Sequence, residues 1–257
     1  QVVHRIGYFS ARIDQMTYAM TFDMPRRSGT VLVNVSLVDP AVLARHIEEI
    51  RKVFAKGYAM GTHVMLAEPG DNVGGVDVPK DKVGFCTVCS ITLNGVLLKH
   101  GVPSMSRFGG LLELDDGKPR RFVEVIHYDS TSIDPLEVFI RSGMTGYRKA
   151  IVDGSGRIGA SFRDLPANSR ELVVHIAERL KDVGLGGFLT IGLPGQSVFD
   201  VPVSEGRLGA VVIGGLNPIA ILEEAGIRVV SRAMSGLVEY NRLYSFEELP
   251  QRLRSLL

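Results

Sequence analysis

The feature that most constrains this chain is a stretch that occurs twice. Residues 69–107 align with residues 194–232 without a gap, and ten aligned positions are identical. Ordinary amino-acid usage would give about two or three identities by chance. The identical residues, numbered in the first copy, are Pro69, Gly70, Val73, Val76, Val78, Gly84, Leu97, Gly101, Ser106 and Arg107. Two copies are too few for a solenoid, so the repeat predicts two related halves.

Each copy has the pattern of a strand, a tight turn and a helix. In the first copy an apolar run at 83–88 leads through small and polar residues to a helix that stops at Gly101. In the second copy the run at 208–213 leads through the turn at 214–218 to a helix closed by Gly226. Glycine directly after an apolar-periodic segment is a common helix stop.

The rest of the chain predicts a mixed α/β (α+β) fold. Alternating segments joined by turn residues predict two hairpins, 16–22 with 29–38 and 111–114 with 121–126. Asp-Pro pairs at 39–40 and 134–135 predict helix starts, because they supply an N-cap and a proline at the first helical position. We expect one regulatory domain, residues 1–257, built of two homologous halves, 1–128 and 129–257. The halves would pack about a pseudo-twofold axis.

Composition limits the kinds of partner. The 257 residues are 45% hydrophobic and 22% charged, which is enough for a sizeable core. The net charge of +1 gives no argument for a nucleic-acid surface. No apolar run approaches the roughly 20 residues that a bilayer span requires, so no membrane partner is expected. The two cysteines indicate a cytoplasmic protein with reduced thiols.

The two strand-to-helix turns are the strongest candidates for binding. Backbone N–H groups at a helix start lack partners and attract anions, and small residues let an anion approach. Arginines at equivalent positions beyond each helix could add bidentate contacts to a carboxylate. The predicted effector-binding residues are Ser90, Thr92, Asn94, Arg107, Gly214, Gly215, Asn217 and Arg232. The alternative is that the turns only cap buried helices and the arginines form structural ion pairs.

Other chemical motifs give little support for catalysis. Cys86 and Cys89 form a CxxC pair before a helix, but no second pair completes a zinc site, and buried structural thiols are the alternative reading. No two histidines have metal-ligand spacing on one helix, and no nucleophile elbow or phosphate-binding loop is present. We therefore predict no catalytic residue, no metal and no cofactor, and a binding protein rather than an enzyme.

Several blocks of the sequence, in order, resemble the archaeal nitrogen-regulatory repressor family NrpR. The blocks are residues 29–38, 86–103, 107–110, 134–139 and 211–218. The resemblance implies the effector-sensing domain of a transcriptional repressor of nitrogen-assimilation genes, with 2-oxoglutarate as inducer. It also implies that DNA is bound by a separate, upstream winged helix-turn-helix, and no such motif is expected within this chain.

Together these observations lead to one hypothesis and two alternatives. Two turns, each with an arginine, would hold the small dicarboxylate 2-oxoglutarate, and its binding would bias the packing of the halves and the geometry of a homodimer. The first alternative is an enzyme that acts on a small anionic substrate or uses the Cys86 and Cys89 thiols. The second is a dimerisation scaffold without a ligand.

Overall fold

The computed structural model describes residues 7–256, and its strands form two five-stranded antiparallel sheets and a small hairpin. Sheet 1 has the order β11-β1-β5-β2-β12, where β1 is Thr30–Val38, β2 His63–Ala67, β5 Val83–Val88, β11 Val230–Glu239 and β12 Tyr244–Ser245. Sheet 2 has the order β7-β6-β8-β10-β9, where β6 is Met105–Asp115, β7 Lys118–His127, β8 Gly156–Pro166, β9 Phe188–Ile191 and β10 Arg207–Ile213. The small hairpin pairs β3, Asn72–Val73, with β4, Val76–Asp77.

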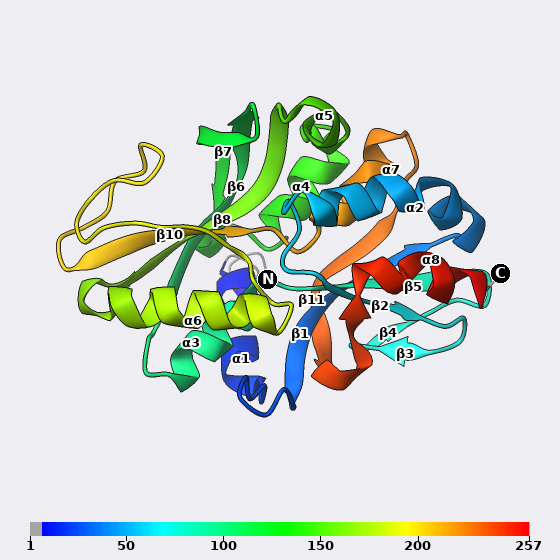
Figure 1. The fold of residues 1–257 in the computed structure, drawn as a ribbon, viewed down its shortest axis with the longest axis horizontal. Helices are drawn as coiled ribbons and strands as arrows, with labels where there is room; N and C mark the ends of the chain where they lie inside the picture. Colours follow the sequence, from blue (N-terminus) through cyan, green and yellow to red (C-terminus); the bar gives the residue numbers. More distant parts are fainter. Residues whose placement is uncertain (1–6, 257) are drawn as a thin grey trace.

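Helices cover both faces of the sheets. The α-helices are α1 Tyr8–Ala19, α2 Pro40–Ala55, α3 Ile91–Lys99, α4 Pro135–Arg141, α5 Tyr147–Asp153, α6 Arg170–Asp182, α7 Ala220–Glu224 and α8 Leu249–Arg254. Short 3-10 turns are η1 Tyr128–Ser130, η2 Ala167–Ser169, η3 Asn217–Ile219, η4 Tyr240–Arg242 and η5 Phe246–Glu248. Helices α2, α4, α5 and α7 lie on one side, and α1, α3 and α6 lie on the other (Figure 1).

Two large apolar cores result, one on each face of the sheets. Val83 and Phe85 belong to the core with α2, α4, α5, α7 and α8, whereas Cys86 and Val88 belong to the core with α3 and α6. This follows from the strand period of two, which points successive side chains to opposite faces. Both cores take residues from both sheets, which indicates one continuous packed unit.

The strand after each repeat helix leaves the sheet of its own half. Strand β6 follows α3 but pairs with β8 in sheet 2, and β11 follows α7 but pairs with β1 in sheet 1. The register also corresponds, because Ser106 lies opposite Arg163 and its aligned residue Ser231 lies opposite Ser36. Each sheet is therefore made from both halves of the chain. The pseudo-twofold axis itself stays a prediction.

The local signals at the helix starts and at the second hairpin are confirmed. Asp39 Oδ1 accepts from the N–H groups of Ala41 and Val42, and Asp134 Oδ1 accepts from Leu136 N–H at 2.6 Å. The 111–114 and 121–126 segments lie in β6 and β7. These strands are joined through two residues with positive φ, Asp116 and Gly117, as a tight hairpin turn requires.

The predicted strand at 16–22 is wrong, because residues 16–19 complete helix α1. The apolar residues of α1 and its C-cap, namely Phe9, Ile13, Met16 and Met20, recur at helical spacing. All four pack in one cluster with the first strand-to-helix turn. Helix α1 lies close to α3 at Gly95, where a Cβ would overlap the Met20 methyl group. The sequence pattern of this segment fits either a strand or a helix, and tertiary packing selects the helix. No described helix is long and apolar enough to cross a membrane.

Candidate functional site

The first strand-to-helix turn, between β5 and α3, is occupied by the protein's own polar groups. Thr92 Oγ1 accepts from Leu32 N–H at 3.1 Å and donates to Leu32 O at 3.2 Å. Asn94 Nδ2 donates to Ser106 Oγ at 3.0 Å, and both Thr92 and Asn94 are buried. These two predicted site residues therefore hold α3 against β1 and β6.

The centre of this turn contains Arg163, a residue that the sequence analysis missed. Its side chain is 0% exposed and donates to Asn94 Oδ1 at 2.6 Å, to Ser161 Oγ at 2.7 Å, and to both oxygens of Ser90 at 3.0 and 3.2 Å. No carboxylate of residues 7–256 forms an ion pair with it. Burial lowers the pKa of Arg163, and neutral hydrogen-bond acceptors replace its water. An arginine directly after the apolar Phe162, in the middle of β8, was the available signal.

The second turn, between β10 and η3, is closed by packing. Asn217 Nδ2 donates to Tyr58 O at 2.8 Å and to Gly159 O at 2.9 Å, while its buried Oδ1 has no hydrogen-bond partner among the described residues. A Cβ at Gly214 would overlap the Leu136 side chain. The Asn217 side chain therefore fixes the second turn to backbone carbonyls of other segments, and the turn has no room for a ligand in this arrangement.

The structure brings the two turns into contact with each other. A Cβ at Gly215 would overlap Val88 O and lie 2.5 Å from Asn34 Nδ2. Ser90 and Gly215 line one enclosed cavity of about 10 Å3, with Phe9 of α1 also in its wall. Such a space holds about one water molecule, so it cannot hold a dicarboxylate without movement.

The two aligned arginines lie in different surroundings. Arg107 Nη1 donates to Pro202 O at 2.9 Å and lies 3.4 Å from Asp164 Oδ1, and its guanidinium stacks over the Phe162 ring at 5.1 Å. Arg232 is exposed and forms no ion pair with any residue in the described range. Arg232 lines two cavities, and Arg107 lines neither of them.

Arg232 lines an open cavity of about 510 Å3 between α1, α4, β11 and the β3–β4 hairpin. Its polar residues are Arg12, Ser132, Asp134, Glu137, Ser231, Arg232 and Ser235. Arg12 donates to the carbonyls of Met234 and Ser235, where β11 bulges and Met234 has a φ of 45°. Bulges of this kind often re-aim side chains beside functional sites. The cavity adjoins the space between the turns, because Phe9 and Asp134 line both.

Two carboxyl groups of this cavity have shifted pKa values. Burial raises the pKa of Asp134 to about 7, and neighbouring Glu137 adds to the shift. Burial also raises the pKa of Glu137, opposed by a hydrogen bond from Ala233 N–H at 2.7 Å and by the charges of Arg141 and Arg232. A carboxyl that keeps its proton near neutral pH can donate a hydrogen bond to an anion.

The remaining chemical candidates give no reactive site. Cys86 and Cys89 are both buried, and burial raises the pKa of each thiol to about 12. Because the thiolate is the reactive species, neither cysteine is activated at neutral pH. Within the described residues, no group of three or more His, Cys, Asp or Glu could hold a metal ion.

Comparison with known proteins gives a consistent set of relatives. A family model described as NrpR regulatory domains NRD1 and 2 matches residues 6–245. The global nitrogen regulator NrpRI of Methanosarcina mazei is 34% identical over 239 residues, which cover 93% of this chain and 73% of the relative. The global nitrogen regulator NrpR of Methanocaldococcus jannaschii is 29% identical over 230 residues, covering 90% of this chain but 38% of the relative.

A solved structure has the same fold. The crystal structure of a nitrogen repressor-like protein from Methanococcus jannaschii superposes with a TM-score of 0.75 at 28% sequence identity. The match covers 92% of this chain and 97% of that chain.

Proposed function

Because this chain belongs to the family of NrpR regulatory domains, we propose that it is the effector-sensing part of a transcriptional repressor of nitrogen-assimilation genes. Its effector is 2-oxoglutarate, and it acts on DNA only through a separate DNA-binding domain. Its relatives are named global nitrogen regulators, which supports the regulatory role.

The observation that carries the effector proposal is the cavity at Arg232. This arginine has no ion-pair partner in the described structure, and the 510 Å3 around it exceed what a five-carbon dicarboxylate needs. A guanidinium binds a carboxylate bidentately. The hydroxyls of Ser231 and Ser235 line the same cavity, where they already form hydrogen bonds with Ser36 Oγ and Arg232 O. The carboxyls of Asp134 and Glu137 disfavour a dianion only when ionised, and their raised pKa values reduce that repulsion.

The cavity is suited to change the arrangement of the halves. Its walls come from α1 and the β3–β4 hairpin of the first half, and from α4 and β11 of the second half. A ligand that contacts all of them shifts the equilibrium between two arrangements by its difference in affinity for each. In a homodimer, such a shift changes the spacing of attached DNA-binding domains and hence their fit to two operator half-sites.

Calorimetric titration of 2-oxoglutarate into wild type and two single variants tests the site. Arg232→Ala should weaken binding by roughly tenfold or more, since a charge-assisted contact to a carboxylate contributes about 1.5–3 kcal/mol. Arg107→Ala is the matched control, because its guanidinium already binds Pro202 O, and its affinity should stay unchanged. Equal affinity in wild type and Arg232→Ala would remove this cavity from the proposal.

Sedimentation velocity tests the proposed homodimer and its response to the effector. We expect a dimer whose sedimentation coefficient changes when 2-oxoglutarate is added to saturation. A monomer with and without ligand would refute both dimerisation and the coupling to half-site spacing. A dimer with no detectable 2-oxoglutarate binding would favour the scaffold alternative.

A further inference from the structure

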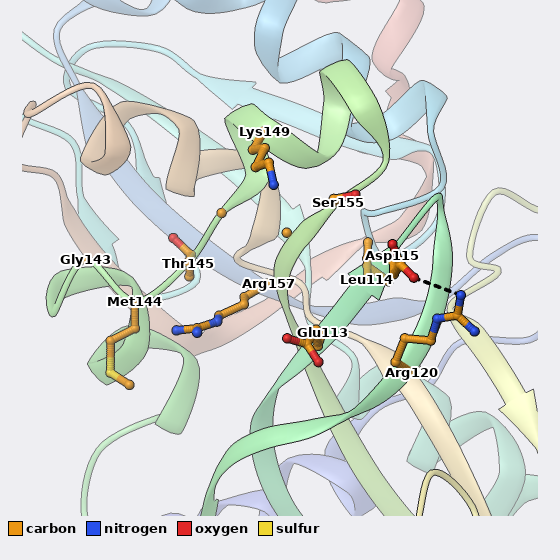
Figure 2. A pocket seen from close by; sticks show the side chains of 12 residues that line it. Glu113, Leu114, Asp115, Arg120, Gly143, Met144, Thr145, Lys149, Ser155 and Arg157 are labelled. Carbon is orange, nitrogen blue, oxygen red and sulfur yellow. Dashed lines mark hydrogen bonds and ion pairs between the residues drawn. The ribbon is translucent and has the colours of Figure 1, made fainter.

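A second and larger cavity lies at the far end of the β6–β7 hairpin. It has a volume of about 840 Å3 and is bordered by the α4–α5 linker at 142–146, the end of β6, the start of β8 and helix α5 (Figure 2). This volume falls within the range of small-molecule sites. The cavity shares no lining residue with the one at Arg232, so it would be a separate site.

The acidic residues of this cavity are already paired. Asp115 Oδ2 accepts from Arg120 Nη2 at 2.8 Å, and the two lie together at one side of the view in Figure 2. Glu113 Oε2 accepts from Arg121 Nε at 3.1 Å across the β6–β7 pair. Each carboxylate is therefore neutralised by an arginine of its own hairpin.

Two cations of the cavity remain without an ion-pair partner in the described structure. Lys149 comes from α5 and Arg157 from the start of β8, and both lie beside Thr145 in Figure 2. Two glycines bring these elements together, since a Cβ at Gly156 would overlap Gly146 O. The backbone contact between the linker and β8 thus places two uncompensated positive charges at one cavity.

We infer that this cavity binds a small molecule that carries a phosphate monoester. A phosphate monoester bears about −1.5 to −2 charges at neutral pH, which matches the two unpaired cations. Arginine supplies a planar fork for two phosphate oxygens, and lysine supplies a point charge to the third. The volume beyond the phosphate accommodates an attached sugar or nucleoside, next to the apolar side chains of Leu114 and Met144.

Calorimetric titration of the whole chain with inorganic phosphate, a sugar monophosphate and a nucleoside monophosphate tests this inference and distinguishes the sources. We expect saturable binding of one ligand per chain for at least one of the three. Lys149→Ala and Arg157→Ala should each weaken it at least tenfold. Arg148→Ala is the matched control, because it removes the same charge from α5 but its guanidinium binds Glu49 at 2.8 Å. Its phosphate affinity should stay unchanged.

Three outcomes would overturn the inference: no saturable binding of any probe, unchanged affinity in both cavity variants, or loss of 2-oxoglutarate binding in Lys149→Ala. The last outcome would assign the cavity to the dicarboxylate effector instead. If phosphate monoesters bind as expected and 2-oxoglutarate does not bind wild type, the proposed effector is wrong and this inference stands.

Discussion

The two strand–turn–helix units share a backbone pattern but differ in what fills their turns. Ser90, Thr92 and Asn94 of the first unit align with Gly215, Asn217 and Ile219 of the second. Ser90 and Asn94 of the first unit accept hydrogen bonds from the buried Arg163, whereas the second turn uses Gly215 to approach the first turn closely. A repeated backbone can therefore serve two different purposes in one molecule.

The strands next to the turns show the same asymmetry. Arg163 of β8 and Ser36 of β1 occupy corresponding register positions, opposite Ser106 and Ser231. Ser36 Oγ makes one hydrogen bond, with Ser231 Oγ at 2.7 Å, but Arg163 makes four. A buried cation is thus present beside the first turn and absent at the corresponding position beside the second. Three predictions test how much this asymmetry contributes to stability.

Removing the cation should have the largest effect. Arg163→Ala removes four hydrogen bonds, to Ser90, Ser161 and Asn94, and opens a cavity, so we expect a loss of about 3 to 5 kcal/mol in the free energy of unfolding. Ser36→Ala at the corresponding position removes one hydrogen bond and should cost about 1 kcal/mol. Urea unfolding followed by circular dichroism measures both. Similar losses in the two variants would mean that Arg163 and Ser36 contribute equally to the free energy of unfolding.

Adding a methyl group to the close-packed second turn should have the next largest effect on the free energy of unfolding. Gly215→Ala forces a Cβ against the carbonyl of Val88, a backbone atom that cannot rotate away, and should destabilise the chain by about 2 kcal/mol. Ser90→Ala, at the aligned position of the first turn, removes one acceptor of Arg163 and should cost about 1 kcal/mol. The same urea experiment compares them, and a neutral Gly215→Ala would show that the turns can separate readily.

The last prediction depends on pH and concerns Asp134, which lies at the cavity between the turns. Because its folded pKa is raised from 3.8 to about 7, the unfolded chain loses this proton first, and stability falls as pH rises between these values. Asp134→Asn keeps a good N-cap and removes this loss. The variant should match wild type near pH 4 and be more stable than wild type at pH 8, because only wild type then has a buried carboxylate. Parallel pH profiles would show that Asp134 is ionised in the folded protein.

Local signals in the sequence were sufficient for much of the fold. The Asp39-Pro40 and Asp134-Pro135 helix starts and the Asp116-Gly117 turn each depend on a few adjacent residues, and each lies where it was predicted. The first repeat helix begins at Ile91, so Thr92 and Asn94, which were expected in the turn before it, lie within the helix. Ser90 and Gly215 line one small cavity, but packing rather than open space lies between the two turns, and the effector site expected there stays a prediction.

Features that depend on distant contacts could not be predicted. Helix α1 has a weak apolar face and is held by Arg12, whose partners are more than 200 residues away in β11. The role of Arg163 depends on Ser90 and Asn94, which lie on the other half of the chain. No local pattern encodes such partners, and the same holds for the pairing of β6 and β11.

The pairing of β6 and β11 also sets the order in which the chain can fold during synthesis. Before the residues after 128 have left the ribosome, β1 lacks β11 along one edge and β6 lacks β8, so both edges remain open to other strands. Sheet 1 is completed only after β12 at Tyr244–Ser245 has emerged. Unpaired strand edges are where partly folded chains associate, so the interval before β12 emerges is when this part of the nascent chain is most prone to aggregate.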